Sequence, residues 1–131
     1  MPTDPVCFAA VIDLHVLIQQ WLAGAAQSDQ LPALMAHFSP SFSMIGLSGL
    51  QLDHAGLHAL FTQAYGKRPG LEIGIDELQL IAQADGLTVV HYREHQHDAR
   101  VLHSVRRSTA VFEQLKNGSL RWLRLHETPC P

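Results

Sequence analysis

The C-terminal stretch from Arg106 to Thr128 constrains the fold most, because its sequence predicts a β-hairpin. Two runs of strand-forming residues, 106–113 and 120–128, flank the pair Asn117-Gly118, which strongly favours a two-residue hairpin turn. This turn would place Phe112 opposite Leu123, Ala110 opposite Leu125, and Ser108 opposite Glu127. One face is then apolar and ends in Arg106, Ser108 and Glu127, while the other carries Trp122, Val111, Arg124, Thr109, His126 and Arg107. A face that changes from apolar to charged is typical of the floor and rim of a pocket.

The rest of the chain predicts helices followed by a sheet. Apolar residues at helical spacing indicate a long amphipathic helix from Asp4 to about Gly24, a short helix at 30–37, and a third helix capped by Asp53 and closing near Gly66. A short strand is expected at 42–47. After Pro69 the residues alternate as in antiparallel strands, and the alternation slips by one residue around Asp76-Glu77, which predicts a β-bulge. We therefore expect an α+β fold, a single domain over residues 1–131, with helices packed on one side of a curved, bulged antiparallel sheet.

Charge and composition argue against several classes of function. The formal net charge is −3 and Lys and Arg form no cluster, so we expect no nucleic-acid partner, because phosphate binding needs a concentrated basic surface. No apolar run approaches the roughly 20 residues of a membrane helix, so we expect no membrane association and a cytoplasmic protein. Cys7 and Cys130 lie near opposite ends of the chain without metal-ligand spacing, and we expect both to be reduced thiols without a function.

The element order, the segment from His37 to Gly46, and the run from Trp122 to Thr128 that ends the last strand resemble the nuclear-transport-factor-2-like (NTF2-like) superfamily. Within it, the chain is most similar to the small bacterial domains of the SnoaL-like and ketosteroid-isomerase-like branches. The resemblance covers nearly the whole chain. It implies a cone-shaped domain, a cavity open at one end, and a homodimer. Function varies within the superfamily, from isomerases, dehydratases, cyclases and hydrolases to non-catalytic binding and assembly domains. The catalytic Tyr and Asp of ketosteroid isomerase are not placed on this sequence residue by residue, which argues against isomerase chemistry.

The strand from Leu87 to His97 leaves two alternatives for the pocket. Alternation puts Val90, Tyr92, Glu94 and Gln96 on one face and Val89, His91, Arg93, His95 and His97 on the other. The length of the loop after His97 decides which set joins the apolar face of the hairpin, and the sequence leaves that length open. We favour Tyr92 and Glu94 inside, because a five-residue loop from Asp98 to Leu102 gives that register and a pocket lined by Val90 and Tyr92 is apolar with a polar group.

On that register a small-molecule pocket is expected between the first and third helices and the sheet. Its expected ligand-binding residues are Trp21, Phe42, Met44, Phe61, Val90, Gln96, Ser108, Ala110, Phe112 and Leu125. The ligand would be a small apolar or aromatic molecule with one polar group. If the protein is an enzyme, Glu94 or Glu127 would be the base and Tyr92 or Arg106 would polarise a carbonyl oxygen, in proton transfer or in hydration and dehydration.

Two structural alternatives stand beside this hypothesis. Arg106, the two carboxylates and Ser108 could form an ion-pair network that seals the edge of the sheet, with Tyr92 as an ordinary core residue. The whole chain could also be a dimeric interaction domain whose cavity is filled by its own side chains.

The nine histidines raise the question of a metal. His95 and His97 point to the same side of their strand, with His91, His103 or His126 as a possible third ligand, but no Cys or acidic partner lies at a recognised spacing. We therefore expect no metal. No nucleotide or flavin motif is present, so we expect no organic cofactor either.

Overall fold

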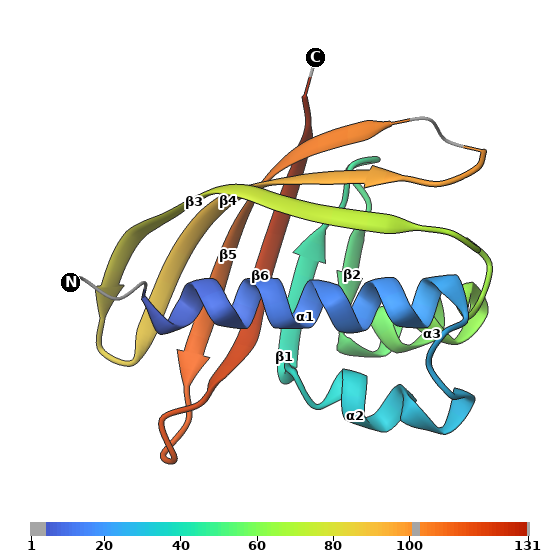
Figure 1. Cartoon of the computed structure of the whole chain (residues 1–131). Coiled ribbons are helices and arrows are strands. Elements are labelled where there is room, and N and C mark those ends of the chain that lie inside the picture. Colours follow the sequence, from blue (N-terminus) through green and yellow to red (C-terminus); the bar gives the residue numbers. More distant parts are fainter. Residues whose placement is uncertain (1–4, 101–102, 131) are drawn as a thin grey trace.

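A six-stranded sheet with strand order β2-β1-β6-β5-β4-β3 is covered on one face by helices (Figure 1). The computed structural model describes residues 5–100 and 103–130. The helical elements are α1 (Val6–Ala23), the 3-10 turn η1 (Ser28–Gln30), α2 (Leu31–Met35) and α3 (His54–Ala64). The strands are β1 (Phe38–Ile45), β2 (Gln51–Asp53), β3 (Glu72–Ala84), β4 (Leu87–His97), β5 (Ser104–Gln114) and β6 (Leu120–Pro129). The predicted α+β fold with a curved sheet is confirmed.

Helix α1 crosses the sheet and supplies part of the core (Figure 1). Its N-cap is Pro5, and Gly24 ends it in the left-handed region at φ 80°, where its N–H bonds the last carbonyls of the helix. The predicted span is confirmed at this end; its expected start at Asp4 lies outside the described residues. By length and composition α1 could span a membrane, but core helices pass the same test, and here Val11, Leu14 and Trp21 are buried against the rest of the fold.

The segment after α1 differs from the prediction in its boundaries. The helix expected at 30–37 is divided into η1 and α2, and β1 begins at Phe38 rather than at Phe42. Pro40 therefore lies within β1. It is tolerated because the pairing of β1 with β6 is irregular between Phe38 and Ser43, so no regular ladder bond is required of a residue without an N–H. The short strand β2 was not predicted.

Asp53 caps α3 as predicted. Its Oδ1 accepts a hydrogen bond of 2.8 Å from the N–H of Gly56, which satisfies one of the free donors at the helix start. The helix ends at Ala64, close to the expected end near Gly66.

Strands β3 to β6 form the predicted antiparallel meander. The expected bulge at Asp76-Glu77 is confirmed, because the pairing of β3 with β4 shifts between Asp76 and Gln79 and Glu77 has φ 53°. Strand β1 is parallel to β6, so the sheet is mixed and not purely antiparallel. The bulge bends β3, and the sheet curves around α1 (Figure 1).

The final hairpin follows the predicted register only far from its turn. Ala110 pairs with Leu125 and Ser108 with Glu127, as expected, but Phe112 pairs with Trp122 instead of Leu123. The turn has three residues, since the N–H of Leu115 bonds the carbonyl of Ser119, and a register shift between Val111 and Phe112 compensates for the extra residue.

This correction moves Trp122 to the other face of the sheet. Instead of lying with Val111 and Arg124, Trp122 is only 2% exposed and packs edge-on against Phe112 with ring centroids 4.6 Å apart. It becomes one of the largest buried side chains of the core, together with Tyr92 and Phe42.

Candidate functional site

A cavity of about 180 Å³ lies between α1, α3, β1 and the concave face of the sheet. Its walls are mostly apolar, from side chains such as Leu14, Ile18, Phe42, Met44, Phe61 and Leu125. Its polar end is formed by His15 of α1, Glu94 and Gln96 of β4, Arg106 of β5, and Glu127 of β6. The cavity thus combines an apolar body with a group of ionisable side chains, which is the usual composition of a small-molecule site.

His15 and Glu94 form a buried ion pair at this end. His15 Nδ1 donates to the carbonyl of Val11 at 2.8 Å, and its Nε2 lies 3.1 Å from Glu94 Oε1. Because a carbonyl and a carboxylate can only accept, both ring nitrogens carry protons when Glu94 is ionised. The arrangement therefore favours a charged imidazolium bound to a carboxylate.

Opposing effects set the pKa values of this pair. Burial disfavours the charge on His15, but the hydrogen bond and the negative charge of Glu94 outweigh burial and raise the pKa of His15. Burial likewise opposes the charge on Glu94, yet the hydrogen bond and charge of His15 prevail and lower the pKa of Glu94. Each partner keeps the other ionised.

A chain of hydrogen bonds leads from Glu94 out to the surface. Gln96 Nε2 donates to Glu94 Oε2, and Gln96 Oε1 accepts from Arg68 Nη1. Arg68 Nε in turn donates to Asp98 Oδ2 at 2.8 Å. Arg68 fixes the amide of Gln96 so that its NH₂ faces Glu94, and the second carboxylate oxygen of Glu94 is thereby engaged as well.

Arg106 and Glu127 form a looser pair on the other side of the polar end. Arg106 Nη1 lies 3.3 Å from Glu127 Oε2, and its Nη2 lies 3.5 Å from Ser104 Oγ. Arg106 Nε is buried without a partner among the described residues. Burial raises the pKa of Glu127, and the negative charge of Glu94 adds to this; Arg106 opposes the rise without cancelling it. Of the two carboxyl groups, Glu127 is the one that takes up a proton more readily.

Tyr92 and Ser108 lie behind the wall of the cavity. The two residues are paired across β4 and β5, and neither hydroxyl has a hydrogen-bond partner among the described residues. Burial, then the charges of Glu94 and Glu127, hold the pKa of Tyr92 well above its usual range, so its hydroxyl stays protonated. The aromatic edges of Tyr92 and Trp122 pack on the ring of His15, with centroids 5.4 and 5.8 Å away.

The favoured register of β4 is confirmed, since Val90, Tyr92, Glu94 and Gln96 are buried on the cavity side. The end of the expected connecting loop, Leu102, lies outside the described residues. Among the predicted site residues, the structure brings eight to the cavity wall: Glu94, Gln96, Arg106, Glu127, Phe42, Met44, Phe61 and Leu125. Val90, Tyr92, Ser108, Ala110 and Phe112 are buried in the core and do not line it. Trp21 borders a separate hollow near α2, and its indole N–H donates to the carbonyl of Phe61 at 2.8 Å.

His15 is the main residue that sequence reasoning missed. It follows Leu14 on a helix face that contributes Val11 and Trp21 to the core. A histidine on a buried helix face needs a polar partner, and that signal could have linked it to the buried Glu94.

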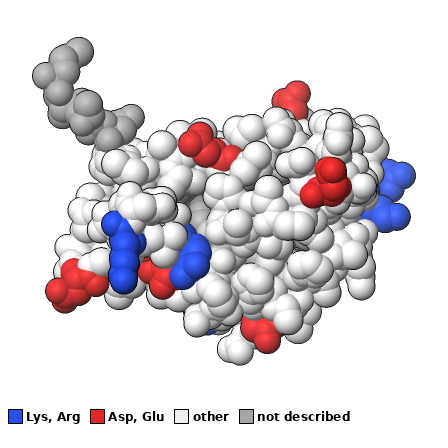
Figure 2. All heavy atoms as spheres, turned by 90° about the horizontal axis from the view of Figure 1, so that it is seen from below, with Lys and Arg blue, Asp and Glu red and all other residues white. Residues whose placement is uncertain are grey.

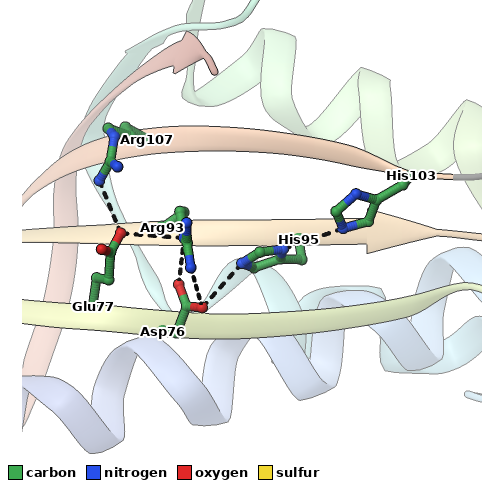
Figure 3. A network of polar contacts seen from close by, with 6 residues as sticks. All are labelled: Asp76, Glu77, Arg93, His95, His103 and Arg107. Atoms are coloured by element: carbon green, nitrogen blue, oxygen red, sulfur yellow. Dashed lines mark hydrogen bonds and ion pairs between the residues drawn. The ribbon is translucent and has the colours of Figure 1, made fainter. Parts of the chain in front are cut away.

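The opposite side of the sheet, here called the outer face, carries Val89, Arg93 and His95 of β4 and Arg107 and Val111 of β5. Asp76 in the bulge of β3 bonds Arg93 twice at 2.8 Å and His95 Nε2 at 3.1 Å (Figure 3). The hydrogen bonds from Arg93 lower the pKa of Asp76 to about 2, and the bond from His95 adds to the effect. Within the described residues no group of three or more His, Cys, Asp or Glu could hold a metal ion.

Known structures place the chain in a family. An NTF2-like protein of unknown function from Pseudomonas aeruginosa is 41% identical, with 95% of this chain and 98% of that chain covered and a TM-score of 0.91. A candidate dehydratase of the NTF2-like family from Streptomyces avermitilis is 10% identical, with 94% and 98% of the two chains covered and a TM-score of 0.68. A candidate association domain of a calcium/calmodulin-dependent protein kinase type II from Thiobacillus denitrificans is 17% identical over all of both chains, with a TM-score of 0.73.

Neither protein-family models nor curated proteins gave a match. The identity to the Pseudomonas aeruginosa protein over nearly the full length of both chains shows that this chain belongs to the NTF2-like family. The two more distant likenesses show the fold alone.

Proposed function

We propose that the protein binds a small apolar or aromatic molecule in the cavity beneath α1, with the polar group of the ligand directed at Glu94, Arg106 and Glu127. The observation that carries this proposal is the His15–Glu94 ion pair, buried at the end of an otherwise apolar cavity. Burying charged groups costs desolvation free energy, so a buried ion pair often adds little to the stability of a fold. A pair of this kind beside a cavity is therefore better explained by a role in ligand binding than by a role in stability. The volume of about 180 Å³ is that of a small ligand, below the roughly 300 Å³ at which drug-sized sites begin.

The reaction that this site supports best is proton transfer, or hydration and dehydration, on an apolar carbonyl compound. Glu127 is the better candidate for the base, because its pKa is raised and its carboxylate is held by a long contact of 3.3 Å to Arg106. Glu94 is held ionised by His15, and its lowered pKa makes it a weak base. Arg106 is placed to polarise the carbonyl oxygen, whereas Tyr92 lies behind the wall. The Streptomyces avermitilis relative is consistent with this class of reaction.

Hydrogen–deuterium exchange tests both binding and proton transfer. Acetophenone, a small aromatic ketone, is incubated with the protein in D₂O, and the loss of its methyl proton signal is followed by NMR. We expect faster exchange than in buffer alone, and a loss of roughly 10²-fold or more of this acceleration in Glu127→Gln. Glu113→Gln, on the far side of β5, is the control. Chemical-shift changes without exchange would leave ligand binding and remove the catalytic part of the proposal.

A second candidate function is a non-catalytic dimeric assembly domain. The observation that favours it is the likeness in fold to the candidate kinase association domain of Thiobacillus denitrificans. In this alternative the outer face pairs with a second copy and the cavity has no ligand. Absence of binding by any small aromatic ketone or acid, together with a stable dimer, would favour this function over the first.

A further inference from the structure

The cationic end of the cavity defines a ligand class more narrowly than the apolar walls do. Arg106 lines the cavity and its side chain is 14% exposed, yet within the described parts of the chain its guanidinium makes only two long contacts, at 3.3 Å to Glu127 and 3.5 Å to Ser104. A guanidinium has five N–H donors, and Nε of Arg106 is buried without a partner among the residues described. The guanidinium of Arg106 therefore has fewer hydrogen-bond acceptors than a buried guanidinium needs. The two coplanar oxygens of a carboxylate match its planar N–H donors best.

The charges around Arg106 also leave room for an anion. Glu94 is balanced by His15 and bonded by Gln96, so it does not compete for the guanidinium. Glu127 is the remaining anion, and burial raises its pKa. The charged and titratable groups that interact with Glu127 are Arg106 from β5, Glu94 and Tyr92 from β4, and His15 from α1. The side chains that β1 and α3 contribute to the cavity are apolar.

We propose that the cavity binds a small aromatic or aliphatic monocarboxylate, whose carboxylate is held by Arg106 while Glu127 takes up one proton from solvent. This inference rests on the ligand-binding part of the proposed function and narrows its ligand to one class; with a carboxylate bound, Glu127 is neutral and does not act as a base. The protons balance as follows. The ligand enters as a carboxylate anion, and Glu127 takes up one proton and becomes neutral. The guanidinium of Arg106 then forms its ion pair with the ligand instead of with Glu127. A second carboxylate beside Glu127 disfavours its ionised form, because like charges in a cavity of low dielectric repel strongly.

The size of the cavity limits the hydrocarbon part. A volume of 180 Å³ corresponds to about six water molecules at roughly 30 Å³ each, enough for a single aromatic ring or a short alkyl chain. Phe42, Phe61 and Leu125 line the apolar part, so a ring or chain there loses its contact with water.

Benzoate and acetophenone form a matched pair of probes, because they have nearly the same shape and differ in the charged carboxylate. Calorimetric titration of both into the wild-type protein at about pH 6, well above the usual carboxyl pKa of about 4, should give at least a tenfold preference for benzoate. As pH rises above the raised pKa of Glu127 in the free protein, the affinity for benzoate should fall by up to tenfold per pH unit, since each binding event takes up one proton. Titrations in buffers of different ionisation enthalpy should show that uptake directly.

Two variants assign the effects to residues. Glu127→Gln stays neutral at every pH, so the proton uptake and its pH slope should disappear while benzoate still binds. A slope that persists in this variant would assign the proton to His15 and overturn the role of Glu127. Arg106→Gln should lose the preference for benzoate, because benzoate loses a charged partner whereas acetophenone loses only a hydrogen bond to its neutral carbonyl. If Arg106→Gln does not fold, the pH dependence of benzoate affinity in the wild-type protein and in Glu127→Gln still tests the proposal.

The remaining outcomes separate this inference from the proposed function. Equal binding of the two probes, or binding of acetophenone alone, would overturn the carboxylate class and leave the small-molecule function in place. If neither benzoate nor acetophenone binds, both the carboxylate class and the proposed small-molecule function are overturned.

Discussion

Glu94 receives hydrogen bonds on both carboxylate oxygens, one from α1 and one from its own strand. His15 lies 3.1 Å from Oε1, and Gln96 donates to Oε2. Removing one partner of a buried ion pair leaves the other charge unbalanced, which costs more than the pair contributes as a whole. At the level of single residues, this pair is where the fold depends most on charge.

We expect Glu94→Gln to lower the free energy of unfolding by about 3 kcal/mol. The contribution of Glu94 is present above the ordinary carboxyl pKa of 4.5 and is lost as pH falls through its lowered folded pKa. The contribution of His15 is present below 6.5 and is lost as pH rises through its raised folded pKa. The deficit should therefore be largest between these two values and smaller in more alkaline solution. Urea unfolding at a series of pH values measures it.

Glu72→Gln is the control for this variant, because Glu72 is mostly exposed and forms a surface ion pair with His97. Its effect should stay below about 0.5 kcal/mol. The pKa of His15, followed by NMR, should fall in Glu94→Gln, because burial then acts on the imidazole without its carboxylate. An unchanged His15 pKa would contradict the ion pair.

At the scale of elements, the bulge in β3 depends on one residue in an uncommon conformation. Glu77 has φ 53°, and its carboxylate contacts Arg93 at 3.2 Å and Arg107 at 2.9 Å across the outer face (Figure 3). These contacts are half-exposed and contribute little stability. The backbone conformation is the more demanding part, since β-branched residues rarely adopt positive φ.

We expect Glu77→Val to destabilise the protein by about 1–3 kcal/mol, measured as a loss of melting temperature. Glu77→Asn removes the same ion pairs but tolerates the left-handed region, so it should cost much less. Gln79→Val, placed just beyond the bulge and exposed, should be nearly neutral. Equal effects of Glu77→Val and Glu77→Asn would mean that the ion pairs, rather than the backbone, hold the bulge.

Local sequence patterns predicted the elements well and their contacts less well. The slip in alternation at Asp76-Glu77 marked the bulge, and Asp53 marked the start of α3, because both signals lie within a few residues. The register shift near Phe112 has no such signal, and the extra residue in the turn carried Trp122 from the predicted outer face into the core. The parallel pairing of β1 with β6 joins segments far apart in the sequence, and local alternation does not predict it.

In the candidate site, too, local sequence patterns predicted neighbouring residues better than contacts between distant segments. Its strand residues, Glu94, Arg106 and Glu127, could be grouped from hairpin register alone. His15 comes from the N-terminal helix, and its place opposite Glu94 depends on how α1 crosses the sheet (Figure 1). The orientation of one element on another is set by packing, which periodicity does not encode.

For the whole molecule, charge gives little indication of a partner. Viewed from the side of α2 and the end of the β5–β6 hairpin, the few basic side chains are spread out and acidic side chains are interspersed, with no large area of one sign (Figure 2). The outer face differs from a purely solvated sheet, because Val89 and Val111 lie on it among ion pairs. Burial of Trp122 removes part of the apolar area that we expected there, but these valines remain, paired across β4 and β5.

We expect a homodimer formed through the outer face, with each copy covering the valines of the other. A stable interface buries about 800 Å² per partner and has an apolar centre, which Val89 and Val111 would supply. Light scattering at micromolar concentration should give twice the mass of the chain, and Val111→Asp should give a monomer, because it places a charge at the centre of the buried surface. Ile12→Asp, on the exposed side of α1 and away from the sheet, is the control and should stay dimeric. A wild-type monomer, or a dimer that Ile12→Asp disrupts and Val111→Asp does not, would contradict this arrangement and move the interface to the helical side.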